Sequence, residues 1–189
     1  MNSRLAWAIG GALVLAAVLL ARGGAQASVS EVSMKGSSVR FPVVSGSNLE
    51  RRRYTLPADF EGDLNIVALA FLREHQTLID TWTATASRLT KADARLHFYE
   101  LPVLTEGNGL FSLFIDGGMR AGIPDKSARE ATITLYLDRT KFLKALDLPT
   151  ERTIYVLLVD RQGRVYWRGE GAHTPAQEAA LEEAIRANR

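Results

Sequence analysis

Four consecutive residues that could do chemistry, Arg73, Glu74, His75 and Gln76, lie between an apolar run and an amphipathic segment. A guanidinium, an imidazole and the free N–H groups at the start of a helix can together hold a carboxylate or a phosphate. Ligands of open α/β sheets bind at the carboxyl ends of strands, which is where this segment is expected. The alternative is an ordinary polar loop, in which Glu74 only favours the start of the helix.

A second candidate site is the glycine-rich stretch 116–125, which contains Asp116 and Arg120. Glycines allow the backbone to approach a ligand closely, and these two side chains could form a fixed ion pair or meet a ligand. The alternative is a glycine-capped helix end followed by an ordered loop. The two stretches would form one site if the second folds back over the first.

Other kinds of chemistry find no support in the sequence. There is no cysteine, which excludes thiolate attack and disulfide exchange. The three histidines, His75, His97 and His173, lie on different expected elements without the spacing of a metal site. Neither a nucleophile elbow nor a phosphate-binding P-loop occurs. We therefore expect no catalytic residue, no metal and no cofactor.

The elements that position the candidate residues follow from hydrophobic patterning. Nearly continuous apolar runs predict buried strands, and apolar residues at steps of three and four predict helices. The last helix is expected to begin at Thr174 and Pro175, where a capping side chain precedes a proline in the first turn. The expected strands after an initial hairpin are 64–71, 96–103, 131–137, 154–159 and 165–167.

The initial hairpin is expected around Phe41–Val44 and Tyr54–Pro57, with its turn at Ser45–Asn48. The elements after it alternate between strand and helix and then finish in a second hairpin and a helix. A helical stripe is also expected at residues 110–115. This order predicts a three-layer α/β/α domain with a mixed central sheet over residues 39–189. Trp82 and Trp167 are expected to be core aromatics.

The segment 1–27 has the character of a leader. Arg4 precedes an uncharged apolar run from Leu5 to Ala21, and Ala25 and Ala27 are small residues at the positions that a signal peptidase reads. The alternative is a retained anchor, since a run of this length is at the short end of what spans a bilayer. Residues 28–38 are polar and are expected to be a flexible tether. The domain is therefore expected outside the cytoplasm.

The charge balance argues against a nucleic-acid partner. The chain carries 23 Lys and Arg against 21 Asp and Glu, but two of the arginines, Arg4 and Arg22, lie in the expected leader. The remaining chain therefore has 21 residues of each sign and no net charge. A neutral domain lacks the basic surface that nucleic-acid binding needs.

The run LNIVALAF at 64–71 and the closing segment IYVLLVDRQGRVYW at 154–167 resemble the thioredoxin-like fold in its exported, membrane-tethered form. The segment from Tyr155 through Trp167-Arg-Gly-Glu-Gly171 into Thr174-Pro175 is similar to mitochondrial ATP-synthase assembly factors. Two features depart from thioredoxins. The tetrad that corresponds to the redox motif is Gln76-Thr-Leu-Ile79, and no proline precedes Ile154, where the resemblance implies a cis-proline.

The combination predicts a redox-inactive thioredoxin-like protein that acts as an assembly or chaperone-like factor at a membrane. We expect a protein partner, such as a subunit of a membrane complex, and a location in the periplasm or on the outer side of the inner membrane. An uncleaved N-terminal segment would hold it there. The alternative is a small-molecule or anion-binding protein, or a cysteine-independent enzyme, that uses Arg73–Gln76 and Asp116–Arg120.

Overall fold

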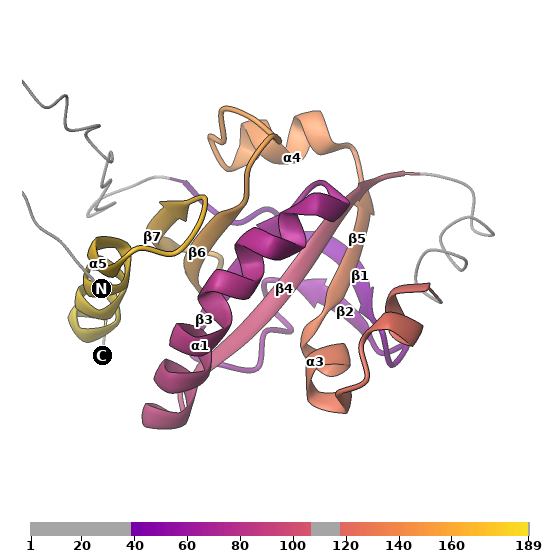
Figure 1. Cartoon of the computed structure of the whole chain (residues 1–189). Coiled ribbons are helices and arrows are strands. Elements are labelled where there is room, and N and C mark those ends of the chain that lie inside the picture. Colours follow the sequence, from indigo (N-terminus) through magenta and orange to yellow (C-terminus); the bar gives the residue numbers. More distant parts are fainter. Residues whose placement is uncertain (1–38, 107–117, 189) are drawn as a thin grey trace, which may run out of the picture. The chain divides into compact units, whose positions relative to one another are not determined.

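In the part of the chain that the structure describes, seven strands form one mixed sheet (Figure 1). The computed structural model describes residues 39–106 and 118–188, which belong to one unit. The expected leader at 1–27, the tether at 28–38 and the helical stripe at 110–115 lie outside these residues.

The strand order across the sheet is β2-β1-β5-β4-β3-β6-β7. The three inner strands β3, β4 and β5 run parallel, and every other neighbouring pair is antiparallel. The strands are β1 (Val44–Asn48), β2 (Arg53–Leu56), β3 (Leu64–Ala70), β4 (Leu96–Thr105), β5 (Ile133–Leu137), β6 (Tyr155–Asp160) and β7 (Val165–Glu170).

Helices cover both faces of the sheet, so the expected three-layer architecture is confirmed (Figure 1). One apolar cluster joins α1 and α5 to one face, and a second joins α4 to the other face. The helices are the 3-10 turn η1 (Arg73–His75), α1 (Gln76–Ala92), α3 (Lys126–Ala131), α4 (Arg139–Ala145) and α5 (Pro175–Ala187). Residues 118–122 form a further helical turn.

The burial of β3 on both faces explains why its sequence is almost entirely apolar. Every one of its residues is buried. Ile66 and Ala68 belong to the cluster under α1 and α5, whereas Val67 and Leu69 belong to the cluster under α4. Because successive side chains point to opposite faces, a strand that is covered on both sides needs side chains that are apolar or fully hydrogen-bonded. Its one polar residue, Asn65, accepts the Gly62 N–H and donates to the carbonyls of Gly62 and Val159.

A hairpin forms in this region, but its first strand is Val44–Asn48 and not the expected Phe41–Val44, so the predicted turn at Ser45–Asn48 is wrong. These residues belong to β1, and the turn follows Asn48, whose side-chain Oδ1 accepts the N–H groups of Glu50 and Arg52 at 3.1 and 2.8 Å. Gly46, which suggests a turn, is needed inside the strand. A Cβ at this position would lie 2.7 Å from the Thr134 carbonyl oxygen on β5.

Local signals near the C-terminus are confirmed. Gly163 adopts φ +80° in the turn between β6 and β7, a conformation that glycine adopts without steric cost. The Thr174 hydroxyl accepts the N–H of Gln177 at 3.2 Å, and Pro175 is the first residue of α5. This cap satisfies one of the N–H groups left free at the helix start.

Candidate functional site

The segment Arg73–Gln76 lies at the carboxyl end of β3, as predicted. Leu72 has extended backbone, Arg73–His75 form the turn η1, and Gln76 begins α1. Arg73, Glu74 and Gln76 are exposed, whereas His75 retains only 2% of its surface. The four candidate residues therefore divide into three solvent-facing side chains and one that belongs to the interior.

The His75 imidazole is fixed by the backbone of the strand end. Its Nδ1 accepts the N–H of Phe71 at 3.2 Å. This contact assigns the neutral tautomer with its proton on Nε2, because Nδ1 must present a lone pair. Nε2 is buried and has no hydrogen-bond partner among the described residues. His75 thus fixes the backbone between β3 and α1, and too little of its side chain is exposed to contact a ligand directly.

Two residues that the sequence reasoning missed complete this end of the sheet. Arg139 Nη1 donates to the Phe71 carbonyl at 3.0 Å, and Arg139 Nη2 donates to Glu151 Oε1 at 2.7 Å. The backbone of Phe71 is therefore held by His75 through its N–H and by Arg139 through its C=O. The sequence contained one signal for Arg139, which follows β5. Since β5 is parallel to β3, the residues after both strands are expected at the same edge of the sheet.

Gln76 turns from this edge toward β4. Its Nε2 donates to Asp80 Oδ1 at 2.9 Å, and it hydrogen-bonds the side chain of Glu100. Burial raises the pKa of Glu100, because the charged form loses water. The hydrogen bond from Gln76 lowers this pKa, and the nearby Asp80 raises it. The net result is a carboxyl group whose pKa is above its usual value and that no cation compensates among the described residues.

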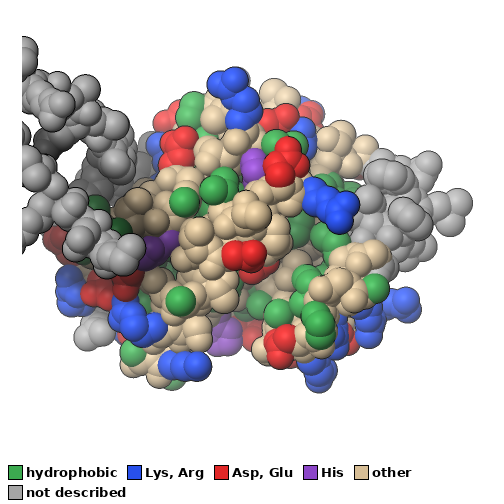
Figure 2. Space-filling model, in the orientation of Figure 1, with side chains coloured by type: hydrophobic (Ala, Val, Ile, Leu, Met, Phe, Trp, Pro, Cys, Tyr) green, Lys and Arg blue, Asp and Glu red, His purple; other side chains and the backbone are tan. Residues whose placement is uncertain are grey.

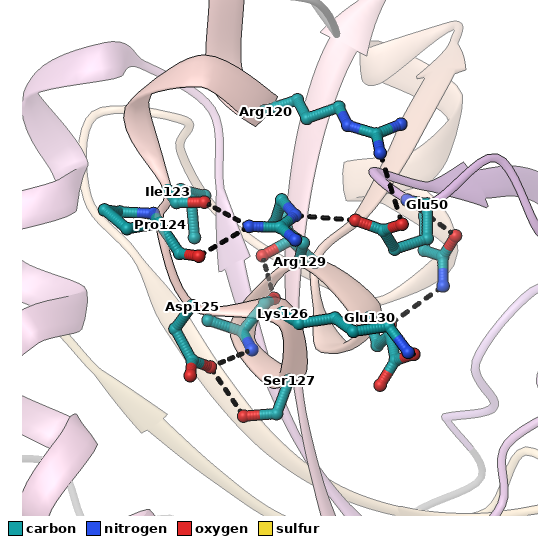
Figure 3. A network of polar contacts seen from close by, with 12 residues as sticks. Glu50, Arg120, Ile123, Pro124, Asp125, Lys126, Ser127, Arg129 and Glu130 are labelled. Carbon is teal, nitrogen blue, oxygen red and sulfur yellow. Dashed lines mark hydrogen bonds and ion pairs between the residues drawn. The ribbon is translucent and has the colours of Figure 1, made fainter.

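Arg120 lies in a different network, at the hairpin turn after β1 (Figure 3). Glu50 accepts from Arg129 Nε at 2.6 Å and from Arg120 Nη2 at 3.3 Å. The hydrogen bond from Arg129 lowers the pKa of Glu50 despite partial desolvation, and the charge of Arg120 adds to the shift. Arg129 also donates to the carbonyls of Ile123 and Pro124, at 2.9 and 2.7 Å. Arg120 therefore helps to fasten this turn.

The structure does not bring Arg73 and Arg120 together. Arg73 follows the carboxyl end of β3, whereas Arg120 pairs with Glu50 in the turn after β1, and strands β5 and β4 lie between β1 and β3 in the sheet. Asp116, the other predicted residue of the glycine-rich stretch, lies outside the described residues. Binding by either stretch stays a prediction, but the described geometry does not join Arg73 and Arg120 in one anion site.

The redox positions of the fold are occupied by residues that cannot exchange electrons. In the tetrad Gln76–Ile79, Gln76 and Thr77 are exposed and Ile79 is buried in the core. The one cis peptide bond of the described residues, Leu56–Pro57, follows β2 and is remote in sequence from Ile154. No group of three or more histidine or acidic side chains in 39–106 and 118–188 could hold a metal ion.

None of the helices in the described part of the chain combines the length and apolar character of a membrane-spanning segment.

Comparison with protein families gives a match over most of the chain. The model of the family described as ATP10 protein matches residues 28–187. The match extends well beyond the C-terminal stretch on which the sequence resemblance rested. No curated protein matches the chain.

Solved structures confirm the thioredoxin-like fold. A thiol:disulfide interchange protein from Bacteroides sp. is 16% identical, with a TM-score of 0.52 over 84% of this chain and 93% of that one. BsSco, a member of the Sco family of cytochrome c oxidase assembly proteins, is 11% identical with a TM-score of 0.54, covering 79% and 93%. A putative electron transport protein from Aquifex aeolicus VF5 is 10% identical with a TM-score of 0.56, covering 80% and 97%.

Proposed function

Because the chain belongs to the ATP10 protein family, we propose that it is an assembly factor that binds a protein partner and does not exchange disulfides. On this proposal the chain acts through affinity, and the fold serves as a scaffold for contacts. The proposal includes export by residues 1–27 and work at a membrane, with a subunit of a membrane complex as the partner.

The observation that carries the proposal is the absence of a thiol at the start of α1. In a thioredoxin-like fold this is where a thiolate would attack, yet the whole chain contains no cysteine. The buried Ile79 and the inward-facing His75 contribute to the interior there. A partner that meets this edge of the sheet can therefore contact side chains but cannot form a mixed disulfide with them.

That surface has the composition of a contact site. Leu72 retains 37% of its surface and is one of two large hydrophobic residues exposed in the described part of the chain. Arg73 and Glu74, next to it, are exposed charges of opposite sign. An apolar side chain flanked by charges supports recognition of a partner, since apolar contact supplies affinity and the charges select orientation.

The test is capture of a partner from detergent-solubilised membranes with the affinity-tagged full chain. We expect a subunit of a membrane complex to be enriched relative to an unrelated thioredoxin-like bait. The capture should survive a thiol reductant, because a chain without cysteine cannot hold its partner through a mixed disulfide. Arg73→Ala should weaken capture while leaving the melting temperature unchanged.

Two results would overturn the proposal. One is recovery of no membrane-complex subunit above the unrelated bait. The other is reduction of insulin by the purified chain at a rate above the reductant alone, which would mean that the protein performs electron transfer by a route other than cysteine.

A further inference from the structure

An open groove with a volume of about 620 Å³ lies between α1 and α3. We call it the α1–α3 groove. Its floor is the first half of β4, with Leu96, Phe98 and Glu100, and its walls include Thr83 of α1 and Ala128 and Ala131 of α3. Figure 2 views this face of the domain, on which hydrophobic side chains are visible between the surfaces of α1 and α3.

The groove exists because β4 is longer than its neighbour β5. Strand β3 pairs with β4 from Leu96 to Pro102, but β5 pairs with it only from Val103 to Thr105. One isolated bridge joins Glu100 to Thr132. Helix α3 has six residues, against 17 in α1. Among the described residues, nothing continues β5 or α3 over the first half of β4, so the half-buried side chains of Phe98 and Glu100 face an open channel.

The channel is acidic as well as apolar. The described residues that line it include Glu100 and Asp125 but no lysine or arginine, and the lining His97 has its Nδ1 3.7 Å from Glu61 Oε2. Asp125 is engaged in capping α3, where it accepts the Ala128 N–H at 2.7 Å and the Ser127 hydroxyl at 2.6 Å. Among the described residues, Glu100 has the amide of Gln76 beside it and no cation, and Asp80 adds a like charge. A carboxylate on an apolar floor gains most from a cation that arrives with its own apolar surface.

We infer that the α1–α3 groove is a docking site for an apolar helical segment of the protein partner, with a lysine or arginine of that segment paired to Glu100. The inference rests on the proposed function, because it names a second place, besides Leu72–Glu74, where the assembly factor contacts its partner. The floor from Leu96 to Glu100 spans about 13 Å, which matches about two turns of a helix. Side chains at helical spacing would lie along the floor, as in other helix-in-groove complexes.

The test uses two short fluorescein-labelled helical peptides of equal length, made of leucine, alanine and glutamine. One carries a single arginine within its leucine stripe, and the other has glutamine at that position. Fluorescence anisotropy with the full chain should show about tenfold tighter binding of the arginine peptide, since a hydrogen bond to a charged group is worth about that factor. Glu100→Gln should abolish the preference, and Glu183→Gln, on the exposed side of α5, should preserve it.

The site of binding is checked by photo-cross-linking. Thr83→p-benzoylphenylalanine in the groove wall should link to the arginine peptide, and Lys144→p-benzoylphenylalanine on α4 should not. Four results would overturn the inference. They are equal affinity for both peptides, binding of neither, a preference that survives Glu100→Gln, or a cross-link from position 83 to this chain itself.

The outcomes also separate this inference from the proposed function. If the full chain captures a membrane-complex subunit and Glu100→Gln captures it equally well, the assembly role stands and the groove is excluded. If the arginine peptide is preferred but no subunit is captured, the groove binds as inferred and the proposed function fails.

Discussion

The backbone N–H of Phe71 donates to Nδ1 of His75 at 3.2 Å, which ties the end of β3 to the residue before α1. Both residues are buried, so water does not replace this contact when it is removed. His75→Ala would leave the N–H without a partner and create a cavity. We expect a loss of about 2–4 kcal/mol in the free energy of unfolding, measured by urea denaturation.

His75→Asn is the matched control for this prediction. The asparagine Oδ1 can reach a position near that of Nδ1 and accept the same N–H, while the buried Nε2 is removed. We expect this variant to recover part of the stability lost in His75→Ala. An alanine variant within about 0.5 kcal/mol of the parent would show that the contact is dispensable.

Asp160 gives a prediction for the dependence of stability on pH. Its carboxylate accepts the N–H groups of Gln162 and Arg164, the Arg164 Nε at 2.6 Å and the Tyr166 hydroxyl at 2.8 Å. Burial alone would raise its pKa, but the hydrogen bonds from Arg164 and Tyr166 outweigh burial and lower it. The folded pKa is therefore below that of the unfolded chain.

A depressed carboxyl pKa stabilises the fold fully above the unfolded value of about 4, and this stabilisation is lost as the pH falls through the folded pKa. Asp160→Asn should cost about 2–3 kcal/mol at pH 7. The difference from the parent should shrink below pH 4, as the parent's Asp160 protonates. Urea denaturation from pH 7 to pH 2.5 measures both, with Glu183→Gln as the control. A difference that is the same at every pH would contradict the assignment.

The features that could be predicted from the sequence are the turns and helix caps that residues close together in the chain determine. The turn at Asp160–Gly163 and the cap at Thr174 depend on side chains within four residues, and both are confirmed. The turn at Ser45–Asn48 was wrong because Gly46 serves a contact with Thr134, far along the chain. A glycine required by close strand approach and one required by a turn have the same appearance in a sequence.

The same division holds for the candidate site: what adjacent residues decide could be predicted, and what distant residues decide could not. The position of Arg73–Gln76 followed from the strand and helix that flank it. The contact of Arg139 with Phe71 and that of Glu100 with Gln76 could not be predicted. Both depend on the order of strands in the sheet, which hydrophobic patterning does not encode. The separation of Arg73 from Arg120 has the same origin, because β1 and β2 join the sheet beside β5 and draw Arg120 to Glu50.

Gly169, which lies in the C-terminal segment that carries the resemblance, is in close contact with the ring of Trp167. Trp167 lies two residues earlier on the same face of β7, and a Cβ at position 169 would overlap its indole ring. The indole has no free space to move into, since Trp167 is buried and packs edge-on against Trp82, with ring centroids 6.0 Å apart. Trp82 in turn donates its Nε1–H to the Gly171 carbonyl at 3.0 Å.

Gly169→Ala should therefore displace Trp167 from Trp82 and cost about 1–3 kcal/mol, as expected for overpacking a core. The near-ultraviolet circular dichroism of the tryptophans should change with it. Gly122→Ala is the matched control, because a Cβ there meets nothing within 4 Å, and its unfolding free energy should stay within about 0.5 kcal/mol of the parent. Equal stability of the two variants would mean that the indole can shift without cost, and that Gly169 is required by something other than the packing of the two tryptophans.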